Sequence, residues 1–289
     1  MTHSPSPTGS ATRRVGCFAH ERSLLAARLA GEAGEVLARH GWELVPGEED
    51  HDFDVALVLG GDGTLLRAAE ALRGRGIPIL GVNVGHMGFL SESDPEDLPD
   101  VLQRLTVGDY RVEDRATVSA LVVGPDGREH ANWALNEVTL EKTVPQRIIE
   151  VRVVVDGRPV STFGCDGIVL ATPTGSTGHA FSGGGPVVWP EVEALLMVPI
   201  SAHALFARPL VVSPQTVVVV EVLDNSRTDG QVSFDGRRTV PLPAGGRLEV
   251  RHSSEPVQLV RFGDAPFADR LVHKFALPVT GWRRPLPPS

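Results

Sequence analysis

The stretch FDVALVLGGDGTLLRAAE, residues 53–70, carries the strongest fold signal in the chain. It begins with the almost continuously apolar run FDVALVL, which is typical of a parallel strand covered on both faces. Gly60, Gly61 and Gly63 then interrupt the apolar run, and a helical pattern starts near Thr64. A buried strand, a glycine-rich turn and a helix in this order indicate an α/β layer.

The same alternation continues on both sides of this stretch. Short apolar runs and amphipathic patterns follow one another along the first part of the sequence. We expect strands at residues 15–19, 53–59 and 77–82, and helices at residues 23–40 and 94–105. Strand–helix alternation of this kind predicts a doubly wound α/β domain.

After about residue 110 the pattern changes to short β runs separated by turn residues. Asp156-Gly157 and Asp235-Gly236 are strong hairpin signals, and Pro125-Asp126-Gly127 is a further turn. We expect strands within residues 118–123, 151–155, 168–171, 216–222 and 248–251. The predicted fold class is therefore α/β plus all-β. It comprises a disordered tail at 1–14, a doubly wound α/β domain at 15–110, an all-β, sandwich-like domain at 111–264, a C-terminal segment at 265–284 and a disordered tail at 285–289.

The composition argues against several classes of function. Of the 289 residues, 42% are hydrophobic and 22% are charged, as in a globular protein, and the formal net charge is −9. Without a dense Lys/Arg run we expect no nucleic-acid partner. Two cysteines are too few for a disulfide framework or a Cys-based zinc site. We see neither a signal region nor a membrane-spanning apolar run, so we expect a cytoplasmic protein with no membrane partner.

The glycine-rich turn is suited to binding phosphate, because glycines let backbone N–H groups approach a ligand and a helix start adds positive partial charge. Asp62 would repel a phosphate unless it holds Mg²⁺ through water or accepts the proton of an attacking hydroxyl. Capping of the following helix is the structural alternative for Asp62. Arg67 either reaches a phosphate or lies in solvent. The candidate phosphate loop consists of Gly60, Gly61, Gly63 and Thr64.

Two further stretches place polar groups where packing alone would not. In FGCDGIVLATPTGSTGHAFSGGGPVVWP, residues 163–190, an apolar strand enters a loop of hydroxyls and glycines that either surrounds a nucleoside or is a turn-rich connector. Asn136 and Glu137 lie in an apolar β run, where an unpaired polar group costs about 1–3 kcal/mol. A ribose diol would satisfy this pair, as would backbone groups at a strand end. His203 is interpreted as a core histidine bonded to backbone rather than as a ligand-binding one. The loop hydroxyls are Thr172, Thr174, Ser176, Thr177 and Ser182.

These motifs, in this order, resemble the NAD kinase family. Its motifs match GGDGT at residues 60–64, the Asn136-Glu137 pair and the pattern from Gly164 to Pro186. The flanking segments GVNVGHMGFLSE and DRLVHKF also look like the family. GGDGT alone is also found in lipid kinases of the diacylglycerol kinase type, but three ordered motifs are far more specific.

The resemblance implies roles for individual residues. Asp62 would accept the proton of the ribose 2′-hydroxyl of NAD, and Gly63 and Arg67 would help to hold the dinucleotide. Asn136 and Glu137 would hold the adenosine ribose. The rest of the NAD site would be Asp166, Thr177, Gly178, His179, Ala180, Phe181 and Ser182.

The resemblance also implies the reaction and its partners. An NAD kinase phosphorylates NAD to NADP with ATP or polyphosphate as donor. The reaction uses a divalent metal such as Mg²⁺, which would be held through the donor phosphates, and no side chain of this sequence is identified as a metal ligand. The all-β domain would bind NAD, and the C-terminal segment would return to the first domain. A homodimer or homotetramer is expected.

The chain departs from the family at Gly178-His179, where the family usually has Ala-Tyr. An imidazole still donates a hydrogen bond and stacks, but it titrates near neutral pH, and glycine loosens the backbone. This departure motivates one alternative, a catalytically weak sensor of NAD(P). The other alternative, a GGDGT-type lipid kinase, fits poorly with the Asn-Glu pair, the TPTGST loop and the net charge of −9.

Overall fold

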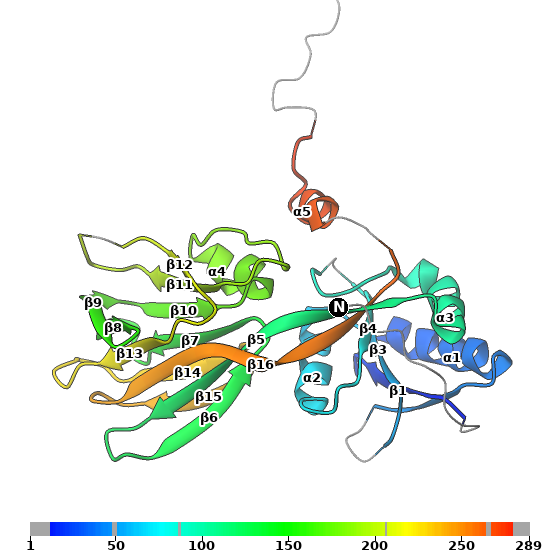
Figure 1. Ribbon diagram of the computed structural model, residues 1–289, viewed down its shortest axis with the longest axis horizontal. Coiled ribbons are helices and arrows are strands. Elements are labelled where there is room, and N and C mark those ends of the chain that lie inside the picture. Colours follow the sequence, from blue (N-terminus) through cyan, green and yellow to red (C-terminus); the bar gives the residue numbers. More distant parts are fainter. Residues whose placement is uncertain (1–11, 48–50, 86–87, 206, 264–266, 280–289) are drawn as a thin grey trace, which may run out of the picture. The chain divides into compact units, whose positions relative to one another are not determined.

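The computed structural model describes residues 12–47, 51–85, 88–205, 207–263 and 267–279 (Figure 1). The chain divides into a first unit, Met1–Glu113 with Gln258–Ser289, and a second unit, Asp114–Val257. Each unit has its own hydrophobic core. The tail expected at residues 285–289 and most of that expected at 1–14 lie outside the described ranges, and Arg14 already belongs to the first strand.

The first unit is built on a parallel sheet in the order β2-β1-β3-β4, with Leu259 pairing beside Ile79 at its end. All five residues of β3 are buried, as the apolar run predicts. The elements of this unit are β1 (Arg14–Ala19), α1 (Leu24–Arg39), β2 (Glu43–Pro46), β3 (Val55–Leu59), α2 (Asp62–Ala71), β4 (Ile79–Val82), the 3₁₀-helix η1 (Pro95–Asp97), α3 (Leu98–Val107) and α5 (Phe267–Phe275).

Helices cover both faces of this sheet. Leu80 and Val82 of β4 share a core with α1 and α3. Gly81 lies between them and faces the other way, where a Cβ would lie 3.0 Å from Leu65 of α2. The doubly wound α/β arrangement is therefore confirmed.

Some elements of the first unit differ from the expected ones. Helix α2 begins at Asp62 rather than near Thr64, because Gly61 already occupies the N-cap position. The sequence pattern predicts neither β2 nor α5. Strand β2 has no fully buried residue to create an apolar run, and α5 likewise buries none of its residues completely.

The second unit contains two antiparallel sheets that share one core. One sheet has the order β12-β11-β10-β7-β14-β15, and the other contains β13 between β16 and β8, with β9 beyond and β5 paired to β6. The elements are β5 (Arg111–Val123), β6 (Glu129–Ala134), β7 (Glu137–Lys142), β8 (Ile149–Val155), β9 (Arg158–Cys165), β10 (Gly167–Ala171), η2 (Thr174–Thr177), α4 (His179–Ser182), β11 (Leu195–Ile200), β12 (Leu210–Val212), β13 (Val218–Val222), β14 (Gly230–Phe234), β15 (Arg238–Leu242) and β16 (Arg247–Arg261).

The predicted hairpin turns have the expected backbone. Asp156 and Gly157 have φ of 49° and 75°, and Asp235 and Gly236 have 52° and 64°. Two consecutive positive φ values are those of the tight turns that match strand twist, which is why Asp-Gly occurs there. The sandwich-like prediction is confirmed, with the short helices η2 and α4 inserted in the Thr/Ser/Gly-rich loop.

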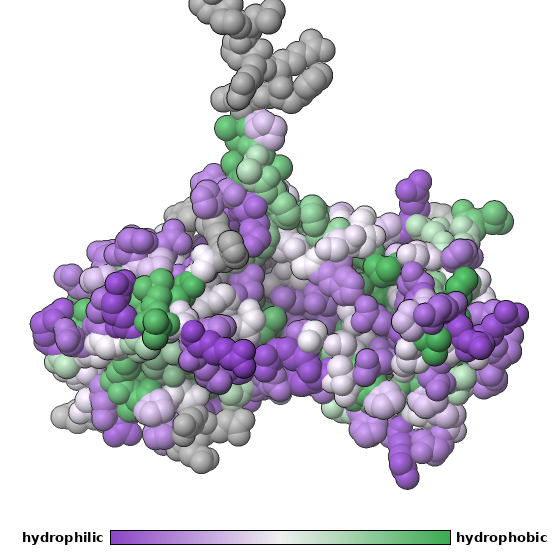
Figure 2. Space-filling view, turned by 180° about the vertical axis from the view of Figure 1, so that it is seen from behind, coloured by the Kyte–Doolittle hydropathy of each residue, from purple (hydrophilic) through white to green (hydrophobic). Residues whose placement is uncertain are grey.

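The face shown in Figure 2 is largely polar, with apolar residues gathered in separate patches. Among the described residues, no helix combines the length and the apolar character needed to cross a membrane.

Candidate functional site

The GGDGT loop of the first unit leads directly from β3 into α2. Gly61 is the N-cap and has no side chain to bond the helix, so Asp62 stands in the first turn and does not occupy the cap position. The capping alternative for Asp62 is therefore wrong. The first N–H groups of a helix lack intrahelical acceptors, and this end of α2 can attract an anion.

The Asp62 carboxylate is held by the backbone of a distant loop. The N–H groups of Phe89 and Leu90 donate to its two oxygens, each over 3.2 Å. Gly88 allows this approach, because a Cβ there would lie 2.0 Å from Asp62 Oδ1. The carboxylate is half-buried and oriented by these two donors.

The glycines of the loop have different surroundings. A Cβ on Gly60 would lie 2.4 Å from the hydroxyl of Thr64, so Gly60 is required for packing of the first helical turn. A Cβ on Gly61 or Gly63 would meet nothing within 4 Å. Gly61 and Gly63 thus leave open space in front of the loop, as close approach of a ligand requires.

Arg67 lies on α2 and points to the end of β1. Its guanidinium donates to Glu21 Oε1 over 2.9 Å and to the carbonyl of Ala19 over 3.1 Å. Ala19 and Leu59 end neighbouring parallel strands, so Arg67 lies at the carboxyl edge of the sheet, where α/β proteins bind ligands.

The Asn136-Glu137 pair in the second unit stands at the start of β7. The Asp235 carboxylate accepts N–H bonds from Leu135 over 3.0 Å, from Asn136 over 2.7 Å and, less closely, from Glu137 over 3.4 Å. Arg238 donates to the same carboxylate over 3.2 Å. The sequence marks Asp235 only as a turn residue, and its role in fixing this pair could not be read from the turn dipeptide.

The Thr/Ser/Gly-rich loop packs against the same pair. Thr172 donates its hydroxyl to the carbonyl of Leu135 over 2.6 Å and accepts the N–H of Gly175 over 3.1 Å. A Cβ on Gly175 would lie 2.0 Å from the carbonyl oxygen of Asn136. The hydroxyls of Thr172 and Ser176 are bonded within the protein, so these two support the loop from inside.

Two buried polar atoms of the pair lack a partner among the described residues: Asn136 Oδ1 and Glu137 Oε2. Burial, and then the charge of Asp235, raise the pKa of Glu137 to about 7, against the N–H of the His179 backbone, which lowers it. One buried carboxyl oxygen and one amide oxygen without partners are groups that a ligand hydroxyl can satisfy.

The predicted NAD-site segment 177–182 follows η2 and forms the single-turn α4. Gly178 is next to Glu137, and a Cβ there would lie 3.1 Å from Glu137 Oε2. An alanine at this position would therefore press slightly on the carboxyl. His179 is half-buried, Ala180 is buried, and Phe181 and Ser182 are exposed.

Asp166 precedes β10 and forms an ion pair with Lys142. The hydrogen bond from Lys142 holds the pKa of the Asp166 carboxyl below its usual range, with smaller contributions from Ser201 and His203. The interpretation of His203 as a core histidine is wrong. Its backbone bridges Gly164, but the residue is exposed. Sequence reasoning did not identify Lys142.

The structure does not bring all the predicted residues together. Asp166 lies apart from the Asn136-Glu137 pair, because its neighbour Gly167 pairs with Glu141 at one end of β10, whereas Glu137 pairs with Ala171 at the other end. Asp62, Arg67 and the phosphate loop lie in the first unit, and Asn136, Glu137, Asp166 and the segment 177–182 lie in the second. Within the part of the chain that the structure describes, no group of three or more His, Cys, Asp or Glu side chains is arranged to hold a metal ion.

Comparisons with known proteins point to one family. Residues 28–110 match the model of the ATP-NAD kinase N-terminal domain, and residues 135–262 match that of the ATP-NAD kinase C-terminal domain. The NAD kinase of Thermobifida fusca is 50% identical, with 98% of this chain and 90% of that protein covered. NAD kinase 2 of Streptomyces coelicolor is 58% identical over 80% of this chain and 76% of that protein.

Two solved structures are also similar. An NAD kinase from Archaeoglobus fulgidus in complex with ATP is 31% identical with a TM-score of 0.76, covering 91% of this chain and 98% of that one. A yeast NADH kinase complexed with NADH has a TM-score of 0.83 at 20% identity, covering 94% of this chain and 89% of that one, which shows a shared fold.

Proposed function

Because this chain belongs to the NAD kinase family and is an NAD kinase, we propose that it transfers the γ-phosphoryl group of ATP to the 2′-hydroxyl of the adenosine ribose of NAD. The observation that carries this mechanism is the placement of Asp62. A carboxylate stands in the first turn of a helix, inside a glycine-rich loop, and two backbone N–H groups orient it. A proton acceptor beside a phosphate loop is the arrangement that phosphoryl transfer to a hydroxyl requires.

In the proposed reaction the ribose 2′-oxygen forms a bond to the γ-phosphorus. The bond from this phosphorus to the bridging oxygen breaks, ADP leaves, and the hydroxyl proton passes to the Asp62 carboxylate. The N–H groups at the start of α2 hold donor phosphate oxygens. Gly63 leaves room for this approach, and the guanidinium of Arg67, which is paired with Glu21, lies at the same edge of the sheet.

The acceptor site lies in the all-β segment, residues 111–264. Asn136 Oδ1 and Glu137 Oε2 are buried without a partner among the described residues. In the proposed complex these two oxygens accept hydrogen bonds from the ribose hydroxyls of NAD. Asp166 and the segment from Thr177 to Ser182 complete the NAD site. His179 would contact NAD where the family usually has tyrosine.

A divalent metal fits this loop only together with the donor. The loop offers one carboxylate, Asp62, and Mg²⁺ commonly binds through one or two carboxylates plus substrate phosphates and water. When bound, the ion would neutralise charge on the donor phosphates. We further propose a cytoplasmic homodimer or homotetramer, with polyphosphate as a second donor to be tested beside ATP.

The test is NADP⁺ formation by the purified protein with NAD and Mg²⁺, with ATP and polyphosphate supplied in separate reactions. Asp62→Asn keeps the shape of the side chain and removes its basicity, so turnover should fall by about 10²–10⁴-fold while NAD still binds. Asp97→Asn, the same change at an exposed position, is the matched control and should keep full activity. An Asp62→Asn enzyme of normal rate would exclude Asp62 as proton acceptor. NAD binding without turnover under either donor would instead favour the sensor.

A further inference from the structure

The backbone that orients Asp62 belongs to the loop from Gly88 to Glu92 in the first unit. Its N–H groups at Phe89 and Leu90 donate to the carboxylate, and Gly88 lies against the Asp62 oxygen. Any shift of this loop therefore moves the carboxylate with it. The position of Asp62 depends on what holds the loop from its other side.

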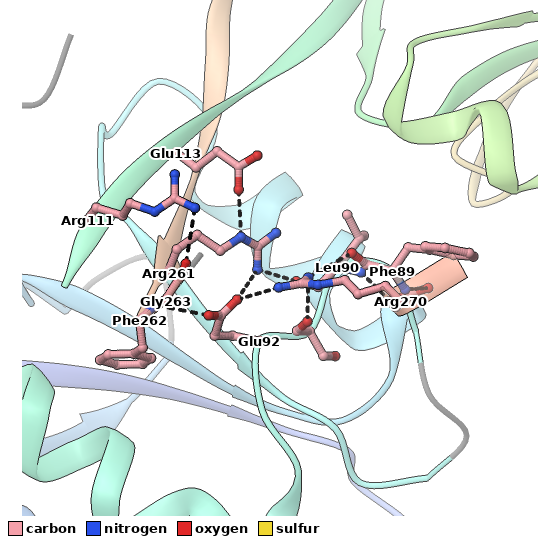
Figure 3. A network of polar contacts seen from close by, with 11 residues as sticks. Phe89, Leu90, Glu92, Arg111, Glu113, Arg261, Phe262, Gly263 and Arg270 are labelled. Atoms are coloured by element: carbon pink, nitrogen blue, oxygen red, sulfur yellow. Dashed lines mark hydrogen bonds and ion pairs between the residues drawn. The ribbon is translucent and has the colours of Figure 1, made fainter. Parts of the chain in front are cut away.

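Two guanidinium groups hold the carbonyl side of this loop, as Figure 3 shows. Arg270 of α5 donates to the carbonyls of Phe89 over 3.4 Å and of Ser91 over 3.0 Å. Arg261 of β16 donates to the carbonyl of Leu90 over 3.2 Å. Three consecutive carbonyls thus accept hydrogen bonds from arginine, while the N–H groups of the first two residues donate hydrogen bonds to Asp62.

Glu92 joins these two arginines. Its Oε2 accepts from Arg270 over 2.7 Å and from Arg261 over 2.9 Å, and its Oε1 accepts the N–H of Phe262 over 2.9 Å. The side chains of Glu92 and Arg270 are only 7% and 13% exposed. Such buried charge pairs hold one geometry, because leaving either charge without its partner is costly.

Helix α5 also packs against the loop through aromatic side chains. The ring of Phe89 lies 5.7 Å from the ring of Phe267 and 5.9 Å from that of Phe275, centroid to centroid. The two ends of α5 therefore contact the residue whose N–H donates to Asp62, and Arg270 lies between them in sequence.

We propose that Arg270 is a positioning residue for Asp62, acting through the backbone of Phe89 and Leu90. This inference rests on the proposed role of Asp62 as proton acceptor. A displacement of about 1 Å at a reacting group can cost on the order of 100-fold in rate. Loss of the Arg270 bonds should therefore lower kcat without altering the substrate contacts.

Arg270 is a better probe than Arg261. The Arg261 side chain is only 3% exposed and forms ion pairs with both Glu92 and Glu113. Its removal would leave Glu113 without this buried partner and would destabilise the surrounding fold. Without Arg270, Glu92 keeps Arg261 and the N–H of Phe262. Arg270→Met, which replaces the unbranched stem of arginine with an apolar chain and removes the guanidinium, should thus fold.

The experiment is a double-mutant cycle in the full chain with Asp62→Asn, Arg270→Met and the double variant. Arg270→Met should lower kcat at least about tenfold, with the KM for NAD and ATP changed less than about threefold. In the Asp62→Asn background the same change should cost less than about twofold, because residues acting as a unit are not additive. Arg270→Lys should recover part of the rate. Asp269→Asn, an exposed neighbour in the same helical turn, is the control and should match the wild type.

The outcomes separate the two proposals. An active Asp62→Asn enzyme would refute the proton acceptor itself. An impaired Asp62→Asn enzyme with an equal Arg270→Met loss in both backgrounds, or a rise in KM at constant kcat, would overturn the positioning role and leave the proton acceptor standing. Thermal unfolding of each variant checks that the variant is folded at the assay temperature, so that a lower rate does not reflect loss of folded protein.

Discussion

Glu137 is a buried carboxyl of the second unit whose titration affects the stability of the fold. Burial, and then the charge of Asp235, raise its pKa from an ordinary 4.5 to about 7. The folded state therefore favours the neutral form, whose stabilising contribution is fully present below pH 4.5 and is lost as the pH rises through about 7. By linkage this group lowers the free energy of unfolding by up to about 3 kcal/mol at pH 8.

Glu137→Gln, which stays neutral, should remove this loss. We expect the variant to gain thermal stability relative to the wild type on going from pH 5 to pH 8, by several degrees at most. The measurement is the melting temperature of both proteins across this range without ligand. Glu141→Gln, an exposed residue of the same strand, should follow the wild type. Parallel curves for Glu137→Gln and wild type would contradict the raised pKa.

At the scale of elements, the turn from β3 into α2 contains glycines of two kinds. Gly60 is needed for packing, whereas Gly61 and Gly63 face open space. Gly60→Ala would place a Cβ 2.4 Å from the hydroxyl of the buried Thr64. Overpacking of this kind costs about 1–3 kcal/mol, so a lower melting temperature and lost activity are expected together.

Gly63→Ala is the matched comparison, since its Cβ would meet nothing within 4 Å. Alanine favours the helix by up to about 1 kcal/mol over glycine, so the stability should hold or rise. Activity should nevertheless fall, because a methyl group would occupy the space proposed for the donor phosphates. Full activity in Gly63→Ala would show that no ligand approaches this glycine closely.

The elements also show what could be predicted from sequence and what could not. The apolar run of β3 and the Asp-Gly hairpins carry their own signals, so the α/β layer and the sandwich follow from the pattern. Half of strand β6 is exposed and α5 buries no residue fully, so neither has an apolar pattern strong enough to detect.

In the candidate site, too, some groups can be predicted from the sequence and others cannot. The motif residues Asp62, Asn136 and Glu137 can be found because side-chain identity marks them. The groups that orient them cannot: Phe89 and Leu90 act through backbone N–H groups, which leave no trace in the choice of side chain. Asp235 is 100 residues from Leu135 in sequence, and no local pattern connects the two.

At the scale of the whole molecule, an acidic chain has to bind two phosphate-bearing substrates in the proposed reaction. With a formal net charge of −9, the surroundings do not attract phosphate in general, so the proposed mechanism relies on local N–H groups and a metal ion to offset the charge. We expect a chelator such as EDTA to stop NADP⁺ formation and excess Mg²⁺ to restore it. NAD binding, measured by calorimetry, should survive chelation. Turnover that persists in EDTA would remove the metal from the mechanism.

The pairing of Lys142 with Asp166 has a practical consequence, because Lys142 and Lys274 are the only lysines in the sequence. An amine-selective reagent therefore has a single lysine target in each unit. Acylation of Lys142 should slow when a dinucleotide covers Asp166, while Lys274 serves as the internal reference. Mass spectrometry of two peptides would then report occupancy of the acceptor site without a reporter group attached to the enzyme.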